Sequence, residues 1–420
     1  MKLQIERVHI EAMIEAFPRL AFVQEQLRFG NKVELSFSQL NAEELDFLQS
    51  LYANGSLALR ARGAQIATLQ KAFAEGGKRF EPEELEMAVP AIASYLSEGA
   101  SRGWLFSASI TGKPLAYVVT RLDFTPPSEE ETGKIFVELK ANAKARLATA
   151  TLRISGPDIA GRTIAEVLAL KGFVKETPEL LQSYDETVAR YFDWRGQYGA
   201  QFSGFGVGYF AENPTATHRD TDYSRKDLII LSSTGGAARL VNDESILGER
   251  VLALDATGDI MAKFVRRVAR NSRLSGKEEA VVEEAQASIA KGLFTELPVH
   301  FYMLMFHLEL HHYLWVHVDD MQPYVYQPEL KDKLVLPPEQ TDLIDILTAE
   351  MDVLMDDIVA GKSGGTTVLC AGPAGVGKTL TAEVYSEIIK RPLYRVHSGQ
   401  LGLNVAAMEV ALKEVLTRAQ

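Results

Sequence analysis

One short run near the C-terminus combines residue types that together bind phosphate. Residues 372–379, Gly-Pro-Ala-Gly-Val-Gly-Lys-Thr, fill every fixed position of the pattern G-x-x-x-x-G-K-[ST]. The glycines let the backbone turn tightly, so that successive N–H groups can point at phosphate oxygens. Lys378 adds a mobile positive charge for the β and γ phosphates, and the Thr379 hydroxyl is placed to ligate Mg²⁺. The run therefore predicts a site for a nucleoside triphosphate with Mg²⁺. The predicted binding residues are Gly372, Pro373, Ala374, Gly375, Val376, Gly377, Lys378, Thr379 and Leu380.

The residues on both sides of this run have the pattern that a phosphate-binding loop needs. Thr366 to Ala371 are mostly apolar or β-branched and predict a buried parallel strand, in which Cys370 is a small core residue. Lys378 to Ile389 carries apolar residues at helical spacing. Leu393 to Val396 predicts a second strand. Strand, loop, helix and strand in this order make an α/β unit whose helix N-terminus faces the phosphates.

At these residues the chain resembles the AAA+ ATPases, a family of P-loop NTPases. The likeness runs through Gly372 to Glu383 and Arg391 to Tyr394, and upstream it includes Lys333 to Pro338 and Asp356 to Lys362. It covers about the last quarter of the chain. The resemblance implies an α/β core with a parallel sheet, ATP and Mg²⁺ as ligands, ATP hydrolysis, and assembly of a homo-oligomeric ring.

The same resemblance limits what this chain is expected to do. AAA+ proteins carry an acidic Walker B pair, a sensor residue, an arginine finger and a helical lid beyond this point, and the chain stops before them. We therefore expect a segment of a longer ATPase, which binds ATP but has no complete catalytic set. The segment 398–404, where unfolding AAA+ rings carry an aromatic pore residue, has none. This speaks against the threading of a polypeptide.

An α+β region precedes this core in the sequence. Residues 1–103 predict an α-rich part, with a capping box at Asn41 and Glu44 and a helix from Pro82 to about Leu96. Residues 104–329 predict a mixed α+β domain. Its expected strands are 105–110, 116–119, 201–210, 228–231 and 251–254, and its expected helices are 163–170 and 178–192. Prolines at 328, 337 and 338 flank a linker, so the incomplete core is assigned to residues 330–420, with helices at 341–359 and 405–419.

Composition and charge exclude several classes of protein. The chain is 46% hydrophobic and 24% charged, which is ordinary for a globular protein, and its net charge of −12 argues against nonspecific nucleic-acid binding by the whole surface. One cysteine excludes an intramolecular disulfide, and the charged N-terminus is unlike a signal peptide, so we expect a cytoplasmic protein. The apolar stretch Val299 to Val318 contains Glu309 and five histidines. A buried hairpin is therefore expected there instead of a membrane span.

Three further clusters could do chemistry. One cluster consists of Lys263, Arg266, Arg267, Arg270, Arg273 and Lys277. Most of these cations would align on one side of a helix and could meet the phosphates of a nucleic acid or of a nucleotide signal, although a solvated face is the favoured interpretation. His307, His311, His312 and His317, with Asp319 and Asp320, could hold a metal ion, but packed histidines of a strand pair are favoured. Gly204 to Gly208 favours a glycine-kinked strand over a dinucleotide loop, and His218 to Asp222 a surface loop.

Three functional hypotheses follow. The first is an AAA+ ATPase that, in its full-length form, uses ATP hydrolysis to remodel a protein partner recognised by residues 1–329. The second is a nucleotide-gated sensor or scaffold with little turnover. The third is an ATPase directed to nucleic acid by the cations of residues 263–277.

Overall fold

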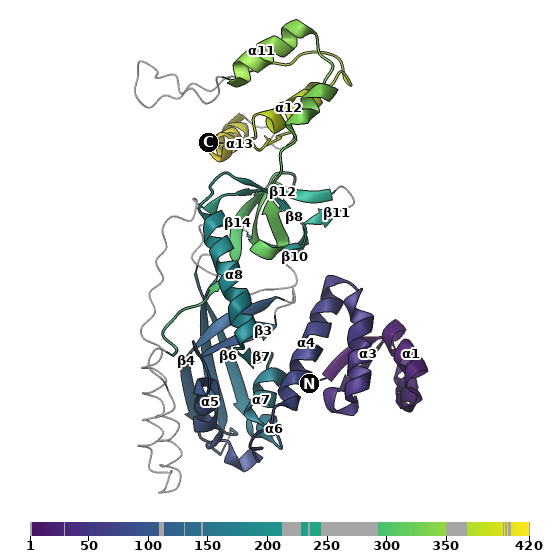
Figure 1. The fold of residues 1–420 in the computed structure, drawn as a ribbon, viewed down its shortest axis with the longest axis vertical. Helices are drawn as coiled ribbons and strands as arrows, with labels where there is room; N and C mark the ends of the chain where they lie inside the picture. The colour runs from purple at the N-terminus through teal and green to yellow at the C-terminus, as the bar shows by residue number, and fades with distance from the viewer. Residues whose placement is uncertain are drawn as a thin grey trace. The chain divides into compact units, whose positions relative to one another are not determined.

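Helices and mostly antiparallel sheets alternate along the chain (Figure 1). The computed structural model describes residues 2–28, 30–108, 113–129, 131–143, 146–211, 228–233, 236–244, 293–349, 368–397, 399, 401 and 405–419. The described residues form two compact units. Unit 1 holds those up to Ala189 together with residues 293–301, and unit 2 holds residues 190–211, 228–244 and those from Tyr302 onward. The predicted region 104–329 is thus shared between the two units.

The first part of unit 1 builds its own apolar core around a two-stranded sheet. Strand β1 (Lys2–Glu6) pairs antiparallel with β2 (Lys32–Ser36), and the helices are α1 (Arg7–Ala16), α2 (Gln24–Leu27), α3 (Ala42–Ala53) and α4 (Leu57–Ala74). Ile5, Ile10 and Leu48 are fully buried in this core. The predicted capping box is confirmed: the Glu44 amide donates to Asn41 Oδ1 and the Asn41 amide donates to Glu44 Oε2, each at 2.9 Å.

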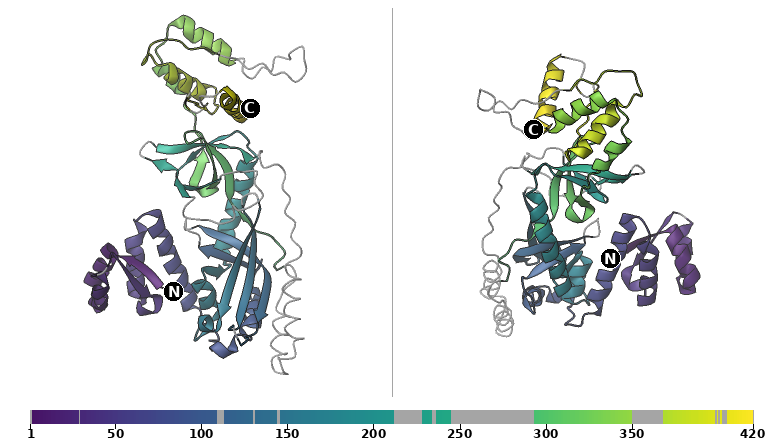
Figure 2. Two further views of the ribbon diagram at one scale, coloured as in Figure 1. Left: turned by 180° about the vertical axis from the view of Figure 1, so that it is seen from behind. Right: turned by 45° about the horizontal axis from the view of Figure 1, so that its top comes forward.

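A larger sheet forms the second part of unit 1. Its strands are β3 (Trp104–Ala108), β4 (Pro114–Thr125), β5 (Lys134–Ala143), β6 (Arg146–Ser155), β7 (Phe173–Lys175) and β13 (Val299–His300). The order is β13-β5-β4-β3-β7, with β6 also on β5. Helices α5 (Ala88–Ser97) and α7 (Ile164–Leu170) lie in front of the sheet in Figure 1, and Figure 2 shows the strands in front when seen from behind. These two helices therefore cover one face.

Three helix predictions can be compared with the structure. Helix α7 agrees with the prediction over 163–170 to within one residue, and Thr163 caps it: its hydroxyl accepts a hydrogen bond from the Glu166 amide. Helix α8 (Pro178–Arg195) also agrees with its prediction, and the boundary between the units falls within it. The single helix predicted from Pro82 to Leu96 is wrong, since a 3₁₀ turn (Pro82–Glu84) precedes α5 and turn residues separate the two.

Unit 2 contains an eight-stranded antiparallel sheet. Its strands are β8 (Gln201–Gly204), β9 (Val207–Phe210), β10 (Leu228–Ile230), β11 (Ser232–Ser233), β12 (Gly236–Asn242), β14 (Tyr302–His307), β15 (His312–His317) and β16 (Met321–Pro323). The order is β10-β9-β15-β14-β12-β8-β16, and β11 pairs with β12. Since β11 follows the edge strand β10 directly and pairs with the interior strand β12, the sheet curves strongly.

The hairpin and the kinked strand predicted in unit 2 are both present. β14 and β15 pair from Tyr302↔His317 to His307↔His312, and β14 is buried throughout. The strand predicted over 201–210 is divided at Phe205 and Gly206. A Cβ on Gly206 would lie 1.9 Å from Asp320 Oδ1, so the chain bends where only glycine allows this approach.

The C-terminal segment of unit 2 is helical. It contains a 3₁₀ turn, η7 (Pro328–Lys333), and the helices α11 (Pro338–Ala349), α12 (Lys378–Ile388) and α13 (Val405–Ala419). Both α12 and α13 were predicted at these positions. Helix α11 starts three residues before the predicted Thr341, and the end of that prediction lies outside the described residues.

The described residues of the two segments predicted as strands beside the phosphate-binding run do not form strands. Residues 368–371 and 391–397 have no strand partner, and Val368 and Leu369 are 52% and 92% exposed. Cys370 is exposed as well, so its predicted role as a core residue is wrong. A short β-branched run becomes a strand only when a neighbouring strand accepts its backbone hydrogen bonds. No strand occurs among the described residues beyond Pro323, and the parallel-sheet core of residues 330–420 stays a prediction.

Several predicted features lie outside the described residues. They are the strand 251–254, the basic residues 263–277, the loop 218–222, and most of the segments 350–367 and 398–404. Among the helices that are described, none combines the length and the apolar character needed to cross a membrane.

Candidate functional site

The loop before α12 has the backbone shape that its glycines allow. Gly375 and Gly377 have φ angles of 83° and 88°, in the left-handed region that residues with a Cβ rarely adopt. Nothing lies within 4 Å of the position that a Cβ would take at either glycine. Backbone conformation, and not crowding, therefore requires glycine at both positions.

This loop leads directly into the N-terminus of α12. Gly377 is the residue before the helix, and Lys378 is its first residue. The first N–H groups of a helix have no partner inside it, and they carry the positive end of the helix dipole. Residues 372–376 and Thr379 are exposed. The structure therefore presents backbone donors and a positive helix end on an open surface, which is the arrangement that binds an anion.

Lys378 places its charge over the same loop. Its Nζ donates hydrogen bonds to the carbonyl oxygens of Gly372, at 2.9 Å, and Pro373, at 2.6 Å. These bonds use two of the three N–H donors of the ammonium group. The side chain thus folds back across the loop and holds its cation at two of the loop's carbonyl oxygens.

The three residues that follow Lys378 in α12 differ in their contacts and exposure. Thr381 closes the first turn, because its amide and its hydroxyl both donate to the Gly377 carbonyl, at 2.8 and 3.0 Å. Thr379, the predicted Mg²⁺ ligand, is exposed. Leu380 is 53% exposed and lines a pocket beside the helix.

This pocket has a volume of about 400 Å³ and follows one face of α12. Leu380, Glu383, Val384 and Glu387 line it at the three- and four-residue steps that define a helix face. The opposite walls come from β12, from the β14–β15 turn, from η7 and from the segment after α12. They consist of Arg239, Leu308, Glu309, His311, Leu330, Leu393, Arg395 and His397.

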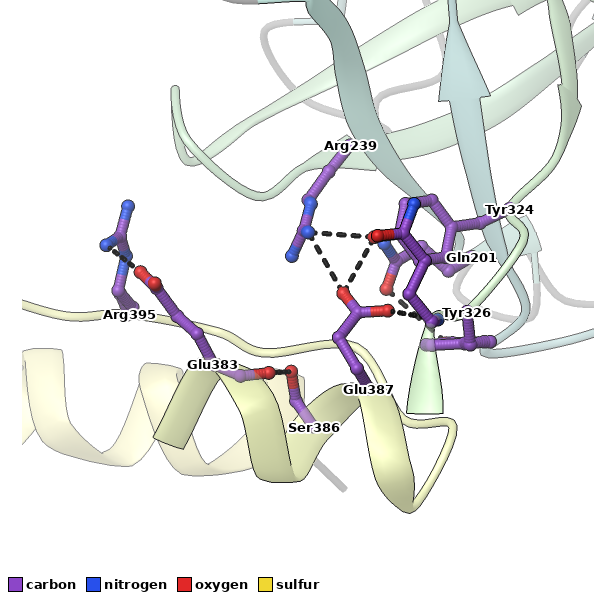
Figure 3. A network of polar contacts seen from close by, with 9 residues as sticks. Gln201, Arg239, Tyr324, Tyr326, Glu383, Ser386, Glu387 and Arg395 are labelled. Carbon is purple, nitrogen blue, oxygen red and sulfur yellow. Dashed lines mark hydrogen bonds and ion pairs between the residues drawn. The ribbon is translucent and has the colours of Figure 1, made fainter. Parts of the chain in front are cut away.

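A buried carboxylate stands at the end of this face. Glu387 is 3% exposed, and Figure 3 shows its oxygens pointing at partners from outside the helix. Oε1 accepts from Arg239 Nη2 at 3.0 Å and from the Tyr324 hydroxyl at 2.7 Å. Oε2 accepts from the backbone amide of Gln327 at 3.0 Å. A buried carboxylate with three such bonds is held in one position.

Aromatic rings complete the surroundings of this carboxylate. Arg239 also donates to the Tyr324 hydroxyl at 2.8 Å, and its guanidinium lies 5.1 Å from the centre of the Tyr324 ring. Tyr326 packs edge-on against Tyr324 and donates to Gln201 Oε1 at 3.4 Å. Burial, reinforced by the bond to Glu387, raises the pKa of Tyr324 to about 12. The phenol therefore keeps its proton at neutral pH and remains the donor to Glu387.

A second acid on the helix has different surroundings. Glu383 pairs with Arg395 at 2.7 Å, and the two side chains are 39% and 51% exposed (Figure 3). Its partner follows α12 in the sequence and does not belong to the sheet. Exposed pairs of this kind contribute little to stability, usually no more than about 1 kcal/mol.

His307 lies at the end of β14 beside this pocket and is buried. His307 Nδ1 accepts the amides of Glu309 and Leu310, at 3.2 and 3.1 Å, and shapes the hairpin turn. Burial lowers the pKa of His307, which favours the neutral ring. Among the described residues no group of three or more His, Cys, Asp or Glu could hold a metal ion.

Arg239, Tyr324 and Glu387 were missed by sequence reasoning. The only local signal was an acid, Glu387, on the face of α12 that also carries Leu380 and Val384. Acids on a buried helix face are rare unless they are paired, so this position called for a partner. The sequence did not indicate which residue this partner is, because Arg239 is 148 positions away.

The sequence matches no model of a protein family, no curated protein and no solved structure.

Proposed function

We propose that this chain binds ATP with Mg²⁺ at the loop formed by residues 372–379. One observation carries the proposal: the left-handed glycines at 375 and 377 shape the loop beside Lys378 and the N-terminus of α12, which both supply positive charge. The exposed amides would hold the phosphate oxygens, and Lys378 would supply a charge for the β and γ phosphates. The exposed Thr379 hydroxyl would ligate the metal ion.

Isothermal titration calorimetry tests this proposal directly. ATP is titrated into the chain in the presence of Mg²⁺, and GTP is titrated separately to determine the preference for the base. We expect saturable binding of ATP that weakens when EDTA removes the metal ion. No heat of binding with either nucleotide would exclude the proposed site.

The wider proposal is that the full-length protein is an AAA+ ATPase that forms a homo-oligomer and remodels a protein partner bound through residues 1–329. Its support is the resemblance of residues 333–394 to that family. Release of phosphate from ATP by the full-length protein, together with its oligomeric state with and without ATP, tests it. A protein that binds ATP, releases no phosphate and stays monomeric would contradict it.

A second candidate is a nucleotide-gated sensor or scaffold. It is favoured by the hydrogen bonds from Glu387 to Arg239 and Tyr324. These bonds connect α12, which begins at the phosphate loop, to the antiparallel sheet, so a change at the loop could alter the sheet. The nucleic-acid-directed ATPase remains a third hypothesis on residues 263–277, which lie outside the described part. Salt-dependent DNA or RNA binding that is lost when these cations become Ala would support it.

A further inference from the structure

We propose that four residues, Arg239, Tyr324, Gln327 and Glu387, couple the phosphate loop to the antiparallel sheet of unit 2. We name them the Glu387 cluster. In this proposal, occupancy of the loop favours the arrangement in which the cluster is closed, and the closed cluster in turn favours occupancy. The inference rests on the proposed binding of nucleotide.

The first step is the helix that joins the two sites. Lys378 opens α12, and Glu387 lies nine residues later in the same helix, which at 1.5 Å per residue spans roughly 13 Å. A helix of this length moves as one body. A shift of the phosphate loop is therefore carried to Glu387.

The second step is that the hydrogen bonds of the Glu387 side chain lead to described residues outside its own helix. Arg239 belongs to β12, and Tyr324 and Gln327 follow β16. The Tyr324 amide also donates to the Gln201 carbonyl in β8, at 2.9 Å, which links the segment to the sheet. Glu387 is buried, so the helix cannot shift at this end without breaking charged hydrogen bonds. In this proposal the cluster has two arrangements, bonded and broken, of which the structure shows the bonded one.

The third step is the contrast with Glu383. Both glutamates lie on the pocket face of α12, one turn apart, and both accept from an arginine. Glu383 is partly exposed and bonds to Arg395, which lies outside the sheet strands, whereas Glu387 is buried and bonds to β12. Glu383 therefore provides a control of the same chemistry, because its own ion pair is not made with a sheet strand.

Coupling of this kind is reciprocal in binding free energy. If the cluster holds α12 in the arrangement that binds nucleotide, weakening the cluster must lower the apparent affinity. If only about one tenth of the molecules then hold that arrangement, the affinity falls roughly tenfold. In the other direction, bound nucleotide must slow hydrogen exchange in β12, which is distant in sequence from the loop.

The experiment compares the native chain with Glu387→Gln, Tyr324→Phe and the control Glu383→Gln. Circular dichroism first establishes that each variant is folded. Tyr324→Phe removes only one hydroxyl, so the proposal can still be tested with this variant if Glu387→Gln does not fold. Calorimetry with ATP and Mg²⁺ measures affinity, and hydrogen exchange with mass spectrometry follows peptides that cover residues 236–242. We expect about tenfold weaker binding for Glu387→Gln, about threefold for Tyr324→Phe and no change for Glu383→Gln. ATP should slow exchange in β12 of the native and control chains only.

Two results would overturn the proposal, and they are distinguishable. If the native chain binds no ATP, both the proposed function and the coupling are refuted. If the native chain binds ATP and Glu387→Gln behaves like Glu383→Gln in both affinity and exchange, nucleotide binding stands and the coupling alone is refuted.

Discussion

Replacing Lys378 by Ala is the sharpest test of the phosphate loop. The change removes an ammonium group whose Nζ lies 2.9 and 2.6 Å from two loop carbonyls. A hydrogen bond to a charged group contributes about 1.5 to 3 kcal/mol. Losing one such bond to a phosphate oxygen corresponds to a rise in Kd of about 10- to 150-fold, and losing two corresponds to a rise of at least about 150-fold.

The fold should survive this substitution. The carbonyl partners of Lys378 belong to exposed residues, so water can replace the ammonium group, and we expect the free energy of unfolding to change by less than about 1 kcal/mol. Lys134→Ala is the matched control, because it removes a lysine from an exposed ion pair with Glu131 in unit 1. Calorimetry gives the affinity, and thermal unfolding by circular dichroism gives the stability. Equal ATP affinities for Lys378→Ala and Lys134→Ala would refute the role assigned to this residue.

Three other outcomes are expected. Gly377→Ala puts a Cβ on a residue at φ 88°, which costs about 1 to 2 kcal/mol of strain, so ATP should bind roughly tenfold more weakly by calorimetry; an unchanged affinity would show that this backbone conformation is not needed. Thr379→Ala should make ATP binding insensitive to Mg²⁺ while Thr379→Ser retains the sensitivity, and equal titrations of the two variants would remove the hydroxyl from the metal site. Burial lowers the pKa of His307 from its ordinary value near 6.5, so the unfolded chain binds more protons than the folded chain below that pH. The free energy of unfolding should therefore have its full value above about pH 6.5 and fall as the pH is lowered through 6.5. His307→Asn keeps an acceptor for the amides of Glu309 and Leu310 but does not titrate, so urea unfolding should show a flatter pH profile; an identical profile would contradict this assignment.

Features set by neighbours in the chain were accessible from the sequence. The start of α12 at Lys378 and the whole of α13 agree with their predictions, since a helix is encoded by apolar spacing and by the residues at its ends. The capping box at Asn41 and the buried hairpin of β14 and β15 were also predicted. In the loop, the glycines predicted to turn the backbone do adopt left-handed conformations at 375 and 377.

Features that depend on a distant partner were not accessible in this way. The runs 366–371 and 393–396 have strand-like composition, but a strand exists only through hydrogen bonds to another strand, and the described parts of these runs have none. The split at Gly206 depends on the approach of Asp320, and the burial of Glu387 depends on Arg239, which is 148 positions away.

The sequence by itself thus determined the phosphate-binding pattern, the helix that carries it and the glycines that shape the loop, because each of these is fixed within one or two turns of chain. Only the tertiary structure decided that the far end of this helix is tied to an antiparallel sheet through Glu387. The physical reason is that periodicity records which side of an element is apolar, whereas the partner of a buried charge depends on which segments meet in space.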